Sequence, residues 1–292
     1  MVRLRRNFLP YLFLAIPIII YLVWVIGPMF YTFYLSLTNW DGLSSAEFIG
    51  FQNYERLFTD KVFFLSLTNN MKWLASFVTV PVVLGLALAL ILNRAVPGDK
   101  FFKMSFYMPM VLAMVVSGLI WGWLYHPRGG LINSVLVGLG IVEKGPGWLS
   151  DRDLALWSII IVAIWRQVGY VMVLYLAGLK SINPEFLEAA KIDGANDWQV
   201  FQKVLLPLLM PVSVIVLVIS VIDSLRAFDL VSVMTRGGPA NSSSVLANYM
   251  YIQAFNNYRM GYAASIAVIL FLISLVFIFI YLWRVMQDEL EY

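Results

Sequence analysis

Residues 10–36 read PYLFLAIPIIIYLVWVIGPMFYTFYLS, a run without any charged side chain. A helix rises about 1.5 Å per residue, so a run of this length can cross a hydrocarbon core about 30 Å thick. A helix also satisfies its own backbone hydrogen bonds, as lipid requires. The run is longer than the apolar region of about 7–15 residues in a cleaved signal peptide. No small-residue cleavage site follows it. It therefore predicts a retained membrane-spanning helix.

Five further apolar runs follow along the chain. Hydrophobic side chains make up 61% of the 292 residues and charged ones 13%, and the mean hydropathy is +0.81. Soluble domains carry about 25% charged residues. We therefore predict an all-α membrane protein with six transmembrane helices. Prolines 81, 109, 207 and 211 are interpreted as kinks or span starts, not breaks. The five later spans are predicted over residues 71–93, 104–125, 154–178, 208–229 and 263–284.

Basic residues near the ends of the spans predict the orientation. Residues 1–9 contain three arginines, which favours a cytoplasmic amino terminus. An even number of spans then makes residues 285–292 cytoplasmic as well. Residues 37–70 become an extracytoplasmic loop, and residues 71–284 form a core whose connection 180–207 is cytoplasmic. In the outer loop, the spacing of Phe48, Phe51, Tyr54, Leu57 and Phe58 predicts a short amphipathic helix at the lipid interface.

Several function classes are disfavoured by what the sequence contains. The basic residues are scattered and form no basic face, which argues against nucleic-acid binding. The chain has no cysteine and one histidine, His126, so we expect no metal site and no thiol chemistry. No phosphate-binding Gly-x-x-x-x-Gly-Lys-Ser/Thr motif is present, so we expect no bound cofactor and no ATP hydrolysis by this chain.

The connection 180–207 carries strong local signals. Asn183 is a good N-cap, Pro184 suits the first helical position, and Glu185 complements the positive end of a helix. These signals predict a short helix over 184–192. Gly194 then permits a sharp turn, and an Asn196–Gln199 pair predicts a second short helix that leads into the next span. These local signals support two interpretations equally: a rigid helix–turn–helix, or elbow, that docks on a partner protein, and a capped cytoplasmic loop without a partner.

The same segment resembles a known family. Residues 188–190 (Glu-Ala-Ala), residues 193–195 (Asp-Gly-Ala), Phe201, residues 206–207 (Leu-Pro) and Pro211 are similar in order and spacing to the EAA signature of permeases of type I (MetI-like) ABC importers. The resemblance implies that the first helix docks on an ATPase subunit. The implied coupling residues are Glu185, Glu188, Ala189, Ala190, Asp193, Gly194 and Pro207.

Three further segments resemble carbohydrate permeases of the MalF and UgpA type. They are residues 50–54 (GFQNY), 130–133 (GLIN) and 235–239 (TRGGP). The resemblance implies a non-enzymatic subunit of the bacterial inner membrane that imports a sugar or sugar-derived solute, including a glycerol-phosphate-like one. The implied partners are a MalG- or UgpE-like permease, two MalK- or UgpC-like ATPase subunits holding ATP and Mg²⁺, and an extracytoplasmic binding protein. The large periplasmic insertion of the maltose protein is missing, so maltose is not implied.

Charged side chains inside the spans indicate a solute pathway. Each costs about 2.5–3.5 kcal/mol on insertion scales, so such residues usually face a cavity or a partner. Arg166 has no partner nearby in sequence and is predicted to face a cavity. Asp223 and Arg226 could pair on one helix face, and Arg226 with Asp229 is interpreted as a neutralising pair at the outer interface. By resemblance, the solute cavity is lined by Arg166, Gln167, Tyr170, Ser220, Asp223 and Ser224.

The sequence leaves three alternative functions, with unequal support. An ABC permease for an amino acid, a peptide or an ion keeps the mechanism and changes the solute. A secondary transporter or channel would show inverted repeats and broken helices, and neither is visible in the sequence. An intramembrane enzyme is disfavoured because no His-Glu-x-x-His or Gly-x-Ser-x-Gly motif is present.

Overall fold

The computed structural model describes residues 2–94 and 97–289 and the side chains of residues 11–94 and 97–279. These residues form helices and no strand, apart from an isolated bridge between Thr38 and Phe48. The predicted all-α fold is therefore confirmed. Residue 1 and residues 290–292, which belong to the predicted terminal segments, lie outside the described residues.

The chain divides into two compact units. The first contains Met1–Lys61 and Met250–Ile273, and the second contains Val62–Tyr249 and Ser274–Tyr292. In the first unit, α1 (Val2–Tyr21) continues through a π-helical segment, Leu22–Ile26, into α2 (Gly27–Leu35). The short helix α3 spans Gln52–Thr59. A further π-helical segment, Ile252–Asn256, precedes α15 (Met260–Glu289), whose residues 260–273 belong to the first unit and whose later residues belong to the second.

The loop between α2 and α3 is held by specific hydrogen bonds. The buried Asn53 amide donates to the carbonyls of Ser36 at 2.9 Å and Thr38 at 2.7 Å. Backbone N–H groups of Ser44 and Leu43 donate to the Asp41 carboxylate and lower its pKa to about 2, so this turn keeps its charge at any physiological pH. The predicted amphipathic helix forms as α3, but it begins after Phe48 and Phe51.

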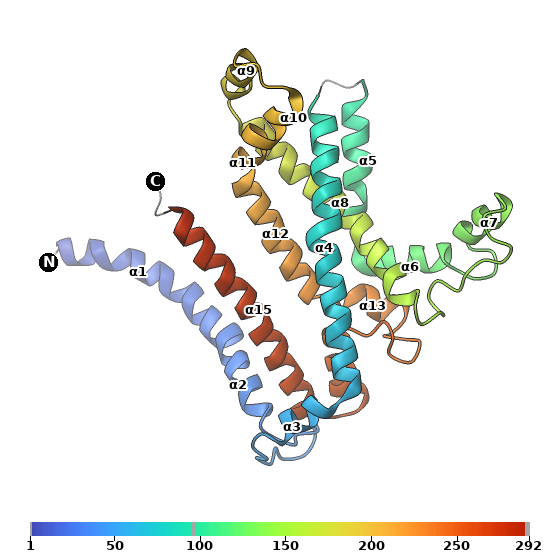
Figure 1. The fold of residues 1–292 in the computed structure, drawn as a ribbon. Helices are drawn as coiled ribbons and strands as arrows, with labels where there is room; N and C mark the ends of the chain where they lie inside the picture. Colours follow the sequence, from blue (N-terminus) through green and yellow to red (C-terminus); the bar gives the residue numbers. More distant parts are fainter. Residues whose placement is uncertain (1, 95–96, 290–292) are drawn as a thin grey trace. The chain divides into compact units, whose positions relative to one another are not determined.

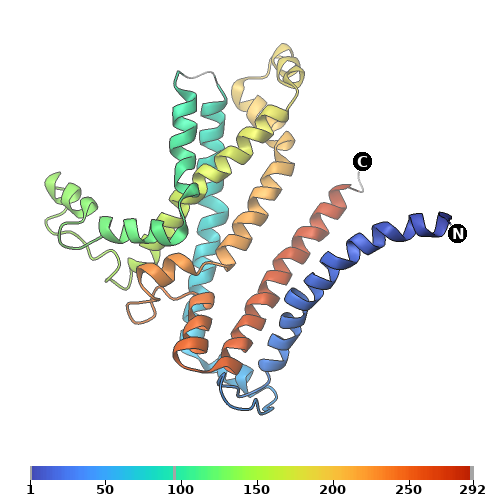
Figure 2. The same ribbon diagram turned by 180° about the vertical axis from the view of Figure 1, so that it is seen from behind.

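The second unit contains the remaining helices (Figure 1). In chain order they are α4 (Lys61–Asn93), α5 (Asp99–Val111), α6 (Met114–Leu124), α7 (Leu131–Gly138), α8 (Ala155–Ser181), α9 (Pro184–Ile192), α10 (Asp197–Val200), the π-helical segment Phe201–Leu205, α11 (Leu206–Leu208), α12 (Met210–Leu225), α13 (Asp229–Met234) and α14 (Leu246–Tyr251). The helices α9 and α10 lie at the end of this unit where α4 ends and α5 begins (Figures 1 and 2).

Four described helices are long and apolar enough to cross a membrane. They contain the segments Tyr11–Leu35, Lys61–Asn93, Ala155–Ser181 and Met260–Phe279. Two further candidates are bent pairs: α5 and α6 meet at 101°, and Asp197–Leu208 meets Met210–Met234 at 66°. The total is six if each bent pair is one span. The predicted span 104–125 lies within the first of these bent pairs, whose helix is interrupted at Leu112 and Ala113.

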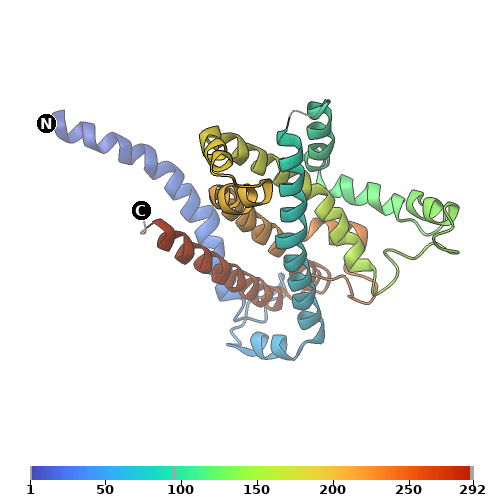
Figure 3. The same cartoon turned by 45° about the horizontal axis from the view of Figure 1, so that its top comes forward.

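The elbow after α8 forms as the local signals predict. The Asn183 side chain accepts from the Glu185 amide at 3.1 Å, and α9 covers Pro184–Ile192. Gly194 has φ +82°, a left-handed turn that favours glycine. Asn196 and Gln199 form a reciprocal capping box with two bonds of 2.9 Å. Figure 3 shows α9 and α10 joined by this turn near the end of α8. The helix–turn–helix is confirmed, whereas its coupling role remains a prediction.

Candidate functional site: a cavity at two helix breaks

A cavity of about 270 Å³ lies in the second unit where two helical segments are interrupted. We call it the Arg166 cavity. Met110 and Met114 line it from either side of the α5–α6 break. The junction between α12 and α13 contributes Arg226, Ala227, Phe228 and Asp229. The remaining lining residues are Trp73, Phe77, Ala163, Arg166, Gln167, Asp223 and Leu230.

Arg166 is the most heavily bonded polar residue of this cavity. Its Nε donates to the carbonyl of Pro109 at 3.2 Å, and its Nη2 donates to the carbonyls of Met110 at 3.3 Å and Leu112 at 2.7 Å. The side chain is only 6% exposed. The prediction that Arg166 borders a cavity agrees with this placement, but its donors are largely committed to backbone carbonyls at the end of α5.

Three of the six predicted lining residues meet in the cavity. Arg166, Gln167 and Asp223 border it, and Gln167 donates to the Asp223 carboxylate over 3.4 Å. Tyr170, Ser220 and Ser224 do not border it. Ser224 bonds back to the carbonyl of Val221 at 2.8 Å, and Ser220 is fully buried.

The expected neutralising pair of Arg226 and Asp229 is not formed. Among the residues that the structure describes, Arg226 makes no ion pair with Asp229 or Asp223. The reason is that α12 ends at Leu225 and α13 begins at Asp229, so the spacing of a continuous helix is lost. Both side chains line the Arg166 cavity instead.

Trp73 is a lining residue that the sequence did not reveal. It is 2% exposed, and its indole N–H has no hydrogen-bond acceptor within the described part of the chain. A buried donor without an acceptor costs about 1–3 kcal/mol. The Phe77 ring lies beside it, tilted by 43°, with ring centroids 6.0 Å apart. A tryptophan within an apolar run gives no local signal that separates a core residue from a ligand contact.

The segment 235–239 forms a tightly bonded loop at the end of α13. Thr235 and Ser243 hydroxyls lie 2.8 Å apart, and Ser243 also donates to the carbonyl of Gly238 at 2.6 Å. Gly237 has φ +86°, and a Cβ there would lie 2.6 Å from the Asn248 side-chain oxygen. The amide of Asn69 on α4 anchors the loop through bonds of 2.8 Å to the carbonyls of Ser242 and Ser244.

The residues expected to couple to an ATPase lie apart from the Arg166 cavity. The helix α9 has no buried residue, and Glu185, Glu188, Ala189, Asp193, Gly194 and Pro207 are exposed while Ala190 is half-buried. Apolar side chains are also uncovered here: Phe186 is 56% exposed and Ile192 85%. An isolated helix of this length is marginal in water. This exposed apolar surface therefore suits contact with another protein.

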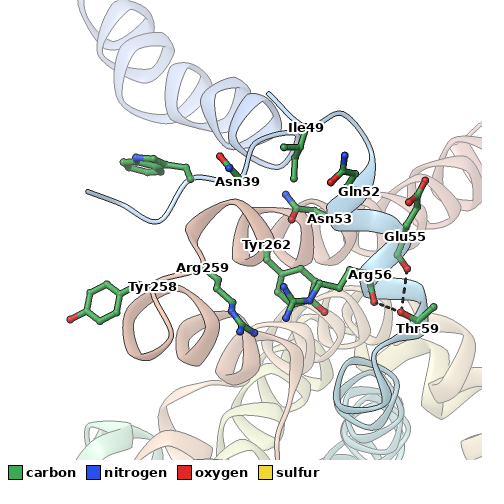
Figure 4. A pocket seen from close by; sticks show the side chains of 11 residues that line it. Asn39, Ile49, Gln52, Asn53, Glu55, Arg56, Thr59, Tyr258, Arg259 and Tyr262 are labelled. Atoms are coloured by element: carbon green, nitrogen blue, oxygen red, sulfur yellow. Dashed lines mark hydrogen bonds between the residues drawn. The ribbon is translucent and has the colours of Figure 1, made fainter. Parts of the chain in front are cut away.

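A second cavity, of about 630 Å³, lies in the first unit (Figure 4). We call it the Arg56 cavity. The Arg56 guanidinium lies over the Tyr262 ring, 4.9 Å from its centroid, and Tyr262 donates to the Asp60 carboxylate at 2.6 Å. Arg259 and Tyr258 are exposed on its wall. It is larger than the Arg166 cavity, but the Arg166 cavity lies at the break between α5 and α6, a bent pair that is long and apolar enough to cross a membrane.

Comparison with known proteins identifies the family. Residues 81–286 match the model for the "Binding-protein-dependent transport system inner membrane component". The chain belongs to this family. It is therefore a permease subunit of an ABC transporter and a multi-pass membrane protein. In such transporters ATP is hydrolysed by a separate subunit. The family assignment excludes a secondary transporter and an intramembrane enzyme. Broken helices, which we expect of a secondary transporter, are nevertheless present in this permease.

Curated relatives and solved structures agree with this assignment. A probable ABC transporter permease of Pyrococcus horikoshii is 38% identical, with 98% of this chain and 99% of that protein covered. The probable starch degradation products transport system permease AmyD of Thermoanaerobacterium thermosulfurigenes is 32% identical, with 96% and 95% covered. A bacterial alginate ABC transporter, crystallised with an alginate pentasaccharide-bound periplasmic protein, has a chain with the same fold (TM-score 0.84, 22% identity, 96% and 94% covered).

Proposed function

We propose that the permease imports a small neutral carbohydrate or sugar-derived solute through the Arg166 cavity. The observation that carries the proposal is the composition of this cavity at the two helix breaks. Trp73 and Phe77 offer aromatic surface, which suits the apolar face of a sugar ring, while Gln167 and Asp223 offer groups for hydroxyls. The cavity holds two arginines and two aspartates, so its charges balance and favour a neutral solute. Relatives named for starch products and for multiple sugars support the same solute class.

The partners and orientation form part of the same proposal. A second, MalG- or UgpE-like permease completes the pathway, two MalK- or UgpC-like ATPase subunits dock on α9, and a binding protein delivers the solute. Both termini and the connection 180–207 face the cytoplasm, and residues 37–70 face outward. The helices α9 and α10 lie at the same end of the second unit as the end of α4 and the start of α5. This placement supports the orientation, because alternate connections of a membrane bundle lie on the same side of the membrane.

Reconstitution tests the proposed function directly. The permease is purified with the proteins that accompany it, placed in vesicles, and supplied with its binding protein and a panel of neutral sugars, sugar phosphates and amino acids. We expect uptake of a neutral sugar that requires ATP. Uptake that continues without nucleotide would contradict an ABC mechanism. Preference for a sugar phosphate or an amino acid would support the alternative solute classes.

Trp73→Phe is expected to weaken solute recognition without harming the fold. The phenylalanine keeps the aromatic surface and removes a buried N–H that has no acceptor within the described residues. Losing one hydrogen bond of about 1.5 kcal/mol to the solute raises the half-saturating concentration about tenfold. The thermal stability of the solute-free protein should be unchanged or slightly higher. Unchanged uptake kinetics would show that the indole N–H does not contact the solute.

Arg259→Glu is expected to slow association with the binding protein. Arg56 and Arg259 outnumber Glu55 among the charged residues that line the Arg56 cavity, and we propose that this cavity faces outward. Reversing one rim charge lowers the association rate constant by about tenfold at low salt, and added salt reduces the difference. Lys100→Glu makes the same charge change in the first turn of α5, which we propose to face the cytoplasm, and should leave the rate unaltered. Equal rates for the three proteins, measured by surface plasmon resonance, would remove the Arg56 cavity from the docking surface.

A further inference from the structure

The end of α5 needs hydrogen-bond donors. The last four carbonyls of a helix have no partner within that helix, and lipid supplies no water to replace one. Pro109 and Met110 belong to this last turn, and Leu112 is its C-cap. All three carbonyls accept from the guanidinium of Arg166. A side chain from α8 thus satisfies the end of α5 at the point where the chain turns by 101° into α6.

The approach of α5 to α8 is unusually close beside this contact. A Cβ at Gly169 would lie 1.9 Å from the Phe106 carbonyl oxygen, so the two backbones touch there. Arg166 lies one helical turn earlier on α8 and reaches the α5 carbonyls from a buried position. Two independent contacts therefore place the end of α5 against α8, one through packing and one through hydrogen bonds.

We infer that Arg166 is a positioning residue that locks the broken helix α5–α6 at the wall of the Arg166 cavity. Met110 and Met114, on either side of the break, line the cavity, so fixing the break fixes their positions. Arginine has five N–H donors, and Arg166 donates to these three carbonyls through Nε and Nη2. The main bonds of Arg166 are thus to the protein itself, in contrast to a residue whose purpose is to bind solute.

Arginine is better suited to this role than lysine. Its planar guanidinium presents several donors at fixed angles, whereas a lysine ammonium is a single point with a flexible stem. The positive charge also complements the negative end of the α5 dipole. Lysine keeps the positive charge but lacks the planar set of donors. Arg166→Lys therefore separates the contribution of the charge from that of the hydrogen bonds to the three carbonyls.

The absence of cysteine from the chain allows a direct test. Spin labels are attached at Met104→Cys on α5 and Trp123→Cys on α6, both at exposed positions, in the assembled, solute-free transporter in nanodiscs. Double electron–electron resonance spectroscopy then measures the distribution of distances between the two spin labels, across the break between α5 and α6. We expect Arg166→Ala to widen it at least about twofold, with Arg166→Lys intermediate, because the end of α5 opens locally. The matched control Gln167→Ala lines the same cavity without bonding α5 and should keep the parent distribution.

Transport measurements distinguish this inference from the proposed function, on which its consequence for uptake rests. Because Arg166→Lys holds the break between α5 and α6 less firmly, we expect its maximal uptake rate to fall by a larger factor than its half-saturating solute concentration rises. Gln167→Ala should show the reverse. If both Arg166 variants keep the parent distance distribution, the positioning role of Arg166 is contradicted, even if their uptake of solute has changed. If Arg166→Ala does not assemble, the distance distribution of Arg166→Lys tests the inference: a broader distribution than the parent's supports it, and an unchanged one contradicts it. Normal uptake kinetics in Gln167→Ala count against the proposed solute site alone.

Discussion

Replacing Gly169 with alanine is expected to destabilise the folded permease by about 3 kcal/mol or more, at the upper end of overpacking effects. The added Cβ would lie 1.9 Å from the carbonyl oxygen of Phe106 and 2.6 Å from its carbon. These are backbone atoms in the middle of α5, so no side chain can rotate to make room. The helices α5 and α8 must separate, and the bonds from Arg166 to the end of α5 lengthen with them.

The measurement is thermal unfolding of the detergent-solubilised permease. Gly138→Ala is the matched control, because Gly138 is helical and a Cβ there would meet nothing within 4 Å. An alanine in an open helical position is neutral or slightly favourable. We expect a large fall in the unfolding temperature for Gly169→Ala and none for Gly138→Ala. Equal unfolding temperatures would show that α5 and α8 do not pack through Gly169.

The elements predicted best from sequence are those whose signals are local. Asn183, Pro184 and Gly194 determine the bounds of α9 through a cap, a preset φ and a left-handed turn. Each signal acts within a few residues, so no knowledge of the tertiary structure is needed. Apolar runs likewise predict helices, since only a helix satisfies its backbone in lipid.

The Arg166 cavity could be predicted only in part, because it depends on two breaks without local signals. Leu112 and Ala113 are ordinary helix residues, and the break between them is capped by Arg166, more than fifty residues later in the chain. A continuous α12 would also allow Arg226 to pair with Asp229, whereas α12 ends at Leu225 and α13 begins at Asp229. Trp73 enters the cavity from α4 through tertiary packing alone.

Reversing the charge of Glu188 is expected to abolish ATP-driven uptake while the permease still folds. Glu188 is exposed on α9, a helix without a buried residue, so Glu188→Lys removes no contact of the core. If α9 docks on the ATPase as we propose, a central residue of that contact contributes about 2 kcal/mol or more, which lowers affinity at least about thirtyfold. The yield of co-purified ATPase and the rate of uptake measure this loss. Glu143, an exposed acidic residue in the connection between α7 and α8, supplies the control Glu143→Lys.

The turn after α9 gives a second, independent view of the same contact. Gly194 has φ +82°, and a Cβ there would meet nothing within 4 Å, so a substitution acts only through backbone strain. Asparagine tolerates this left-handed conformation, whereas β-branched valine does not. Gly194→Asn should therefore retain most ATPase binding, and Gly194→Val should lose it, with both proteins inserted and monodisperse. Full ATPase binding by both Glu188→Lys and Gly194→Val would mean that the elbow is only a capped loop, and that ATP-driven motion reaches the membrane helices elsewhere.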